Sequence, residues 1–274
     1  MIRHSLLIFI FLFTGTAHSA IFGDGNPDNG MEDQRENAPK NLLNSVGTIF
    51  CDGGLRGTAT HIKTALQHNR SIILTAAHVL FDQKTGMSFK QCSYRPENQR
   101  LSSIEFSSIS THQYKPESKN KIQQSETDIV FVALKKRAYQ RSLELAQSKN
   151  TVANNLQLLG YNADSQKISL SSDCTSFESD SFISDQLLLH NCDALSGASG
   201  GPIITATEQG DNAVVIAVHG GTLVSAGASI RSLATGAQVN PEQWINQARI
   251  VDKALLNQLE LFLAYLAKDF PSQK

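Results

Sequence analysis

Short apolar runs, separated by clusters of Gly, Asn, Ser and Asp, are the feature that most limits what this chain can fold into. The runs are VGTIFC (46–51), GTATHI (57–62), SIILTAA (71–77), TDIVFVAL (127–134), LQLLGY (156–161), DQLLLHN (185–191), GPIIT (201–205) and AVVIAVHG (213–220). No helical segments alternate with them. Many short strands in this arrangement indicate an antiparallel barrel or sandwich rather than a parallel sheet.

The composition is that of an ordinary globular protein with a sizeable core. Of the 274 residues, 41% are hydrophobic and 18% are charged, and the formal net charge is −1. This length fits one large domain or two small ones, and all-β folds of this size often count as one. Since the net charge is close to zero and no long basic block occurs, we do not expect nucleic acid as a partner.

The first 20 residues have the layout of a secretory signal peptide. Arg3 is the positive flank, an apolar run extends from Leu6 to Phe13, and small residues follow. A transmembrane anchor is the alternative, but this run is too short to span a bilayer comfortably. Residues 21–40 are polar and nearly free of apolar side chains, which indicates a leader, a propeptide or a loosely attached arm. We therefore expect an exported protein, secreted or periplasmic, with no membrane anchor after signal removal and a folded domain at 41–274.

The C-terminal region departs from the strand pattern. NPEQW, from position 240, is typical of a helix start, with Asn as the cap and Pro at the first helical position. Apolar residues then recur at helical spacing at Val251, Leu255, Leu259, Phe262 and Leu266. The pattern predicts an amphipathic helix over about 241–269, lying on the β core.

Four cysteines remain in the exported chain: Cys51, Cys92, Cys174 and Cys192. Their even number and the lack of a CxxC pair favour disulfides over a zinc site, so no metal is expected. Four cysteines allow three pairings, which sequence alone does not distinguish. Free structural thiols are the alternative, and an oxidising compartment disfavours them.

The stretch GASGGPII (197–204) concentrates three glycines around Ser199, directly before an apolar run. A plain hairpin turn is one interpretation. Another is a nucleophile on a bend, with backbone N–H groups gathered around an oxyanion. The pattern GxSxG also fits the nucleophile elbow of α/β-hydrolases.

Two other stretches supply a base and a carboxylate. ILTAAHVL (73–80) places His78 after an expected strand and two alanines, and TDIVFVAL (127–134) places Asp128 at the start of another. A buried carboxylate beside a histidine fixes its tautomer and stabilises the imidazolium. In the order His, Asp, Ser, these stretches resemble the chymotrypsin-type (trypsin-like) serine peptidases, and most of all the compact bacterial trypsin-like and glutamyl-endopeptidase-like members. The resemblance covers residues 46 to about 235.

The resemblance implies two six-stranded antiparallel β-barrels with a cleft between them, followed here by the C-terminal α-helix. It also implies that His78 is the general base, that Asp128 orients it, that Ser199 is the nucleophile, and that the N–H groups of Gly197 and Ser199 form the oxyanion hole. The implied disulfides are Cys51–Cys92 and Cys174–Cys192. No cofactor is expected, the substrate is a peptide or protein, and we expect a monomer.

Some positions depart from the family pattern. Ala198 stands where mammalian zymogens carry the Asp that binds the new N-terminus, so activation by that ion pair is not expected. Asp193 has the linear position of the pocket aspartate in trypsin, and His219 lies near the histidine of glutamate-specific relatives. Either residue could line the substrate pocket or be a structural residue. An inactive homologue that binds peptides in its cleft, and an esterase on another fold, are the rival functions.

Overall fold

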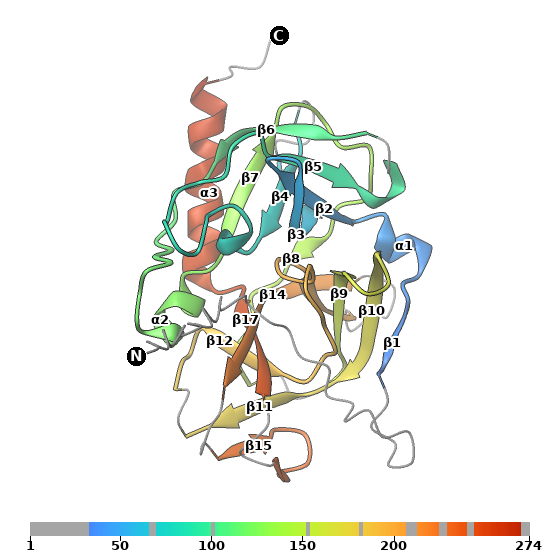
Figure 1. The fold of residues 1–274 in the computed structure, drawn as a ribbon, viewed down its shortest axis with the longest axis vertical. Helices are drawn as coiled ribbons and strands as arrows, with labels where there is room; N and C mark the ends of the chain where they lie inside the picture. Colours follow the sequence, from blue (N-terminus) through green and yellow to red (C-terminus); the bar gives the residue numbers. More distant parts are fainter. Residues whose placement is uncertain are drawn as a thin grey trace, which may run out of the picture.

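The computed structural model describes residues 33–65, 70–99, 102–151, 154–180, 183–206, 213–224, 229–239 and 244–269. The predicted signal peptide and the first part of the expected leader lie outside these residues. Within them the chain forms two β units and a long C-terminal helix (Figure 1).

The first unit is a closed antiparallel barrel. Around the barrel its strands are β2 (Val46–Cys51), β3 (Gly54–Ile62), β4 (Ile72–Thr75), β7 (Val130–Leu134), β6 (Ile104–Ile109) and β5 (Ser93–Pro96). Their β-branched and aromatic residues favour the strand conformation. Closure of the barrel then leaves no strand edge unpaired. The 3-10 turn η2 (Ala77–Val79) follows β4, and the short helix α2 (Lys121–Glu126) precedes β7.

The second unit is an open sheet of eleven strands among the described residues. Its order is β1 (Arg35–Asn37), β10 (Lys167–Cys174), β9 (Leu156–Asn162), β13 (Pro202–Ala206), β14 (Ala213–Val224), β17 (Trp244–Ile250), β12 (Leu187–His190), β11 (Ser176–Ser179), β15 (Ile230–Ser232) and β16 (Gln238–Val239), and β8 (Glu144–Leu145) pairs with β14. The predicted all-β fold with a C-terminal helix is confirmed. Among the described residues the second unit is an open half-barrel sheet, where the resemblance implied a closed six-stranded barrel.

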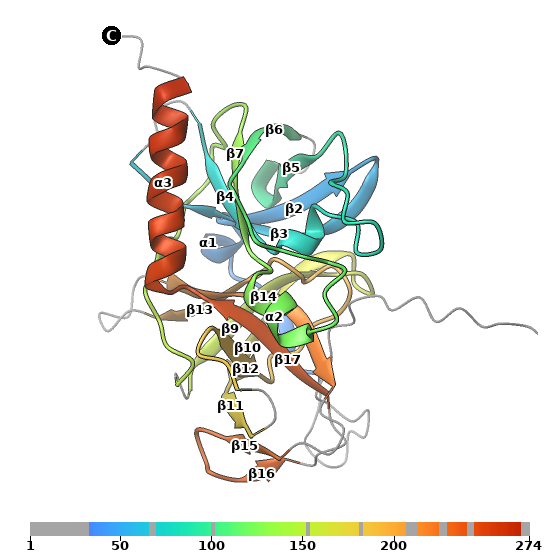
Figure 2. The ribbon, with the colours of Figure 1, turned by 90° about the vertical axis from the view of Figure 1, so that its left-hand side faces the viewer.

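The C-terminal helix α3 (Lys253–Asp269) leaves the second unit and runs along the first barrel (Figures 1 and 2). The five apolar positions predicted to face the core are all buried and join the hydrophobic cluster that contains the core of the first barrel. The expected start at 241 is wrong, because residues 244–250 form β17, which pairs with β14 and β12. Among the described residues no helix has the length and apolarity needed to cross a membrane.

The end of the expected leader is not a loose arm. Arg35–Asn37 form β1, which pairs antiparallel with β10. Arg35 is bound to Asp33 and to Asp164, with Nη2–Oδ2 distances of 2.6 and 2.7 Å. Backbone pairing and these ion pairs hold a polar segment that has little apolar surface to bury.

Candidate active site

His78 lies in η2, immediately after β4. Ala76 and Ala77 are fully buried, so the turn packs closely on the barrel while the imidazole projects from it. The His78 side chain is 8% exposed and that of Asp128 is 7% exposed. His78 Nδ1 lies 2.6 Å from Asp128 Oδ2, and the His78 backbone N–H donates to Asp128 Oδ1 at 2.8 Å. The carboxylate thus holds both the ring and the backbone of the histidine.

The barrel explains why residues 50 apart in sequence meet. Strands β4 and β7 are antiparallel neighbours, and Thr75 at the end of β4 is paired with Val130 at the start of β7. His78 follows β4 and Asp128 precedes β7, so both lie at the same end of the same strand pair. The Asp128 N–H donates to the carbonyl oxygen of Ser125 at 3.2 Å, which connects the carboxylate to the end of α2.

Two opposing effects act on the pKa of His78. Burial disfavours the imidazolium and lowers the pKa, whereas the charge of Asp128 and the hydrogen bond to it raise it. The carboxylate outweighs burial, so the pKa of His78 is above its ordinary value. His78 is therefore a stronger base than a free imidazole.

Ser199 belongs to a tight bend that we call the serine turn (residues 196–201). Gly197 has φ +99° and Gly200 has φ +84°, a region in which glycine is favoured. The Ser199 carbonyl accepts from the Thr58 N–H at 2.8 Å, which joins the turn to β3. A Cβ on Gly57 would lie 2.6 Å from Ser199 O and 2.7 Å from Val79 Cγ2. Gly57 therefore lies between the serine turn and the residue next to His78.

Two backbone amides of the serine turn have no partner among the described residues. In the part of the chain that the structure describes, neither the Gly197 N–H nor the Ser199 N–H has a hydrogen-bond acceptor. The peptide groups to which they belong are fixed through their carbonyls: the Ser196 carbonyl accepts from Ala163 N–H at 3.0 Å, and the Ala198 carbonyl from Gly201 N–H at 2.9 Å. Two free donors on fixed peptide planes are what an oxyanion hole requires.

Asp193 is buried beside the N-terminal segment. Its Oδ2 accepts from the Gln34 N–H at 2.7 Å, and its own N–H donates to Ser171 Oγ at 2.9 Å. The carboxylate thus has a backbone partner within the protein.

His219 is fully buried on β14. Its Nδ1 lies 3.2 Å from Nε2 of His190, a residue that the sequence did not single out. Burial, followed by the effect of His190 and then of His78, places the pKa of His219 well below its ordinary value. Burial also lowers the pKa of His190 to about 3. Both rings are therefore neutral near pH 7.

Both implied disulfides are present. Cys51 is bonded to Cys92, 41 residues away in sequence, and Cys174 is bonded to Cys192, 18 residues away. The second bridge ties β10 to the segment that leads into the serine turn. No group of three or more His, Cys, Asp or Glu side chains that could hold a metal ion occurs among the described residues.

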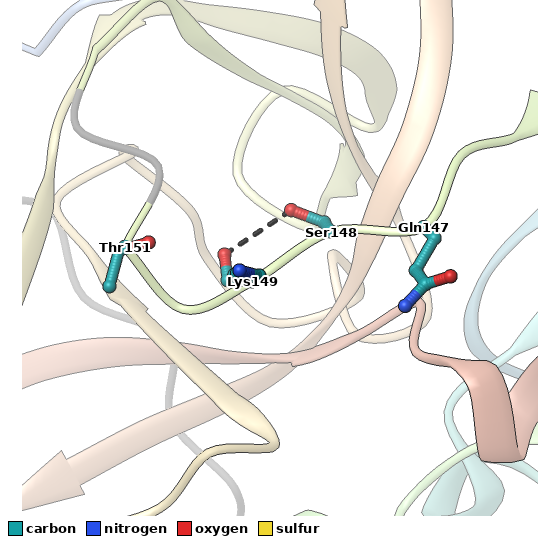
Figure 3. Close-up of a pocket in the computed structure, with 4 residues that line it drawn as sticks. All are labelled: Gln147, Ser148, Lys149 and Thr151. Atoms are coloured by element: carbon teal, nitrogen blue, oxygen red, sulfur yellow. Dashed lines mark hydrogen bonds between the residues drawn. The ribbon is translucent and has the colours of Figure 1, made fainter.

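A separate hollow of about 500 Å³ is lined by Gln147, Ser148, Lys149 and Thr151 (Figure 3). Ser148 Oγ donates to the Lys149 carbonyl at 3.2 Å. None of these four residues is a carboxylate, a histidine or a thiol, so the hollow carries no chemistry comparable to that of His78 and Asp128.

Two supporting residues were missed by sequence reasoning. Thr58 binds the serine turn from β3, and Arg249 on β17 donates through Nε to the Glu126 carbonyl at 2.7 Å, holding the end of α2. A threonine in an apolar strand and an arginine expected in a helix give no signal of these contacts.

Comparison with known proteins gave one matching family model, described as a trypsin-like peptidase domain, over residues 57–218. That is more than half of the chain. Comparison with curated protein sequences gave no match.

Among solved structures, the chain is similar to a Glu endopeptidase, with a TM-score of 0.58, 17% identity, and coverage of 85% of this chain and 98% of that one. It is also similar to the protease Anisep of Arthrobacter nicotinovorans, with a TM-score of 0.55, 13% identity, and coverage of 81% and 96%. Neuropsin from mouse brain gives a TM-score of 0.58, 11% identity, and coverage of 84% and 99%. At these identities the likeness concerns the fold.

Proposed function

The chain belongs to the family of trypsin-like peptidase domains, and from this premise we propose that it is an exported serine endopeptidase acting through His78, Asp128 and Ser199. Family membership makes it a hydrolase of the serine peptidase class. The triad, the acyl-enzyme route and export are the parts that we propose.

The observation that carries the proposal is the double contact of Asp128 with His78. With Nδ1 donating to the carboxylate at 2.6 Å, the neutral ring has its lone pair on Nε2, the atom needed to accept a proton from a hydroxyl. The serine turn packs against the same part of the first barrel, as the position of Gly57 indicates. This arrangement favours Ser199 as the hydroxyl that His78 deprotonates.

The reaction then follows from the roles of these groups. Ser199 Oγ attacks the substrate carbonyl carbon while its proton moves to His78 Nε2, and Asp128 stabilises the imidazolium. The Gly197 and Ser199 N–H groups bind the oxyanion of the tetrahedral intermediate. His78 gives the proton to the leaving amine, and the acyl-enzyme forms. Water then attacks the ester carbonyl carbon while His78 takes its proton. The bond from the acyl carbon to Ser199 Oγ breaks, His78 returns the proton to Oγ, and the acid product leaves.

Peptides or proteins are the proposed substrates, and a monomer in the extracellular space or the periplasm is the proposed state. The two disulfides are compatible with an oxidising compartment. The bond from Gln34 to Asp193 favours a structural role for Asp193 over a pocket that binds Arg or Lys. The burial of His219 against His190 favours a structural role for His219 in the same way.

A fluorophosphonate probe tests the triad because it labels only an activated serine. We expect labelling of the purified protein and its loss in Ser199→Ala. Ser196→Ala is the matched control, since Ser196 is an exposed serine of the same turn, and it should label like the wild type. A folded wild-type protein that does not react would contradict the proposal and favour the inactive, peptide-binding homologue.

Digestion of a peptide library by the same protein tests the pocket. Cleavage after Arg or Lys would assign a substrate-binding role to Asp193, and cleavage after Glu would assign one to His219. Any other preference supports a structural role for both.

A further inference from the structure

Thr58 makes an unusual number of contacts for one buried side chain and its backbone. Its Oγ1 donates to the Gly197 carbonyl at 2.8 Å and accepts from the Tyr161 N–H at 2.9 Å. Its N–H donates to the Ser199 carbonyl at 2.8 Å, and its carbonyl accepts from Thr75 Oγ1 at 2.7 Å. Thr58 is fully buried, so water does not compete for these bonds.

These contacts complete the fixing of the serine turn. Four consecutive carbonyls, from Ser196 to Ser199, accept hydrogen bonds. The Ser196 and Ala198 carbonyls accept from the N–H groups of Ala163 and Gly201. The Gly197 and Ser199 carbonyls both accept from Thr58. Since a peptide group is planar, holding its carbonyl fixes the direction of its N–H as well. Thr58 therefore holds the peptide planes that alternate with those of the two free amides.

The turn needs such a restraint because of its glycines. Gly197 has φ +99° and no side chain, so rotation about its backbone bonds meets little steric resistance. Two bonds supply the resistance at the Gly197–Ala198 peptide group: the Ala198 N–H donates to the Leu195 carbonyl at 3.0 Å, and the Thr58 hydroxyl donates to the Gly197 carbonyl. The hydroxyl also accepts from Tyr161 on β9, so it ties this peptide group to the sheet.

We infer that Thr58 is a positioning residue for the oxyanion hole. Its hydroxyl holds the Gly197 carbonyl and thereby raises the rate of acylation. The inference rests on the proposed function, because it assigns a purpose to the free amides of that site. It concerns a residue of the first barrel that acts on a turn supplied by the second unit, so it also couples the two units.

Thr58→Val removes the hydroxyl at nearly constant volume, and the separate variant Thr58→Ser keeps it. Thr60→Val is the matched control: Thr60 is two residues further along the same strand, is fully buried, and its hydroxyl has no hydrogen-bond partner among the described residues. We expect kcat for an amide substrate, for which acylation is the slow step, to fall about ten- to a hundred-fold in Thr58→Val with KM little changed, somewhat less than the loss of an oxyanion donor itself. Thr58→Ser should recover most of the rate, and Thr60→Val should match the wild type.

Hydrogen exchange on the same proteins separates this inference from the proposed function, since it requires no catalysis. Exchange of the Tyr161 amide should accelerate in Thr58→Val, which removes its acceptor, and should stay unchanged in Thr60→Val. A Thr58→Val protein with wild-type kcat, or with unchanged exchange at Tyr161, would overturn the inference while leaving the triad intact. A wild type without activity would overturn the proposed function, and the exchange result would still decide whether Thr58 restrains the turn. If Thr58→Val does not fold, Thr58→Ser and Thr58→Ala are compared in its place.

Discussion

Replacing Asp128 by Asn tests the proposed mechanism most directly, because the structure determines how the amide must sit. Asp128 Oδ1 accepts from the His78 backbone N–H, which is only ever a donor. The amide oxygen must take that place, so the NH2 group faces His78 Nδ1 at the position where Oδ2 lies 2.6 Å away. Nδ1 then has to be the acceptor, and the ring proton moves to Nε2. A ring protonated there cannot accept the proton of Ser199.

The expected loss in kcat is about 10⁴-fold, the effect typical of this substitution in a Ser-His-Asp triad. At about 1.36 kcal/mol per tenfold change, that is about 5 kcal/mol of transition-state stabilisation. The assay is kcat with an amide substrate at pH 8, with the fold checked by thermal unfolding.

Asp164→Asn is the control, since it removes the same charge from an exposed ion pair with Arg35 and should leave kcat unchanged. An Asp128→Asn protein that is folded and retains kcat within about tenfold of the wild type would refute the assigned geometry, because a misplaced proton on the base cannot cost so little.

The remaining predictions concern pH and the second disulfide. In the wild type kcat/KM should rise with pH through the pKa of His78, with a midpoint above 6.5, because the ring must be neutral to act as a base and Asp128 raises its pKa. In Asp128→Asn burial remains and the charge is gone, so the midpoint should fall below 6.5; a pH–rate profile that does not move would show that another group titrates. Replacing both Cys174 and Cys192 by Ala should lower the free energy of unfolding by about 3 kcal/mol, the loop-closure term for 18 residues, as measured in urea. An unchanged urea midpoint would mean that the bridge does not form in the purified protein.

The strands next to His78 and Asp128 could be predicted from the sequence because each coincides with a short run of apolar side chains. Val46–Cys51 begins and ends where the apolar run does, and the runs that contain His78 and Asp128 also became strands followed or preceded by turns. Local composition sufficed there, since apolar β-branched residues pack on either face of a barrel wall.

Strand β17 could not be predicted in this way. NPEQW resembles a helix start, and the following segment contains Asn246, Gln247 and Arg249, which are polar yet buried. Asn246 Nδ2 donates to the Cys192 carbonyl, and Arg249 binds the Glu126 carbonyl and Asp252. Asp252 is local, but the Cys192 and Glu126 carbonyls are far away in sequence, so these bonds leave no trace in a local pattern. Thr58 was missed for the same reason, since its partners also lie far away in sequence.

The short strand β1 affects how the protein can be produced. Composition places the beginning of the folded domain at residue 41, and a recombinant chain begun there would lack Arg35–Asn37. The outer side of β10 would then present unpaired N–H and C=O groups to solvent, and such a surface recruits other chains by strand addition. Loss of these three polar residues would replace a short charged edge strand by the longer edge of β10, so we expect a chain begun at residue 41 to self-associate more readily than one that retains β1.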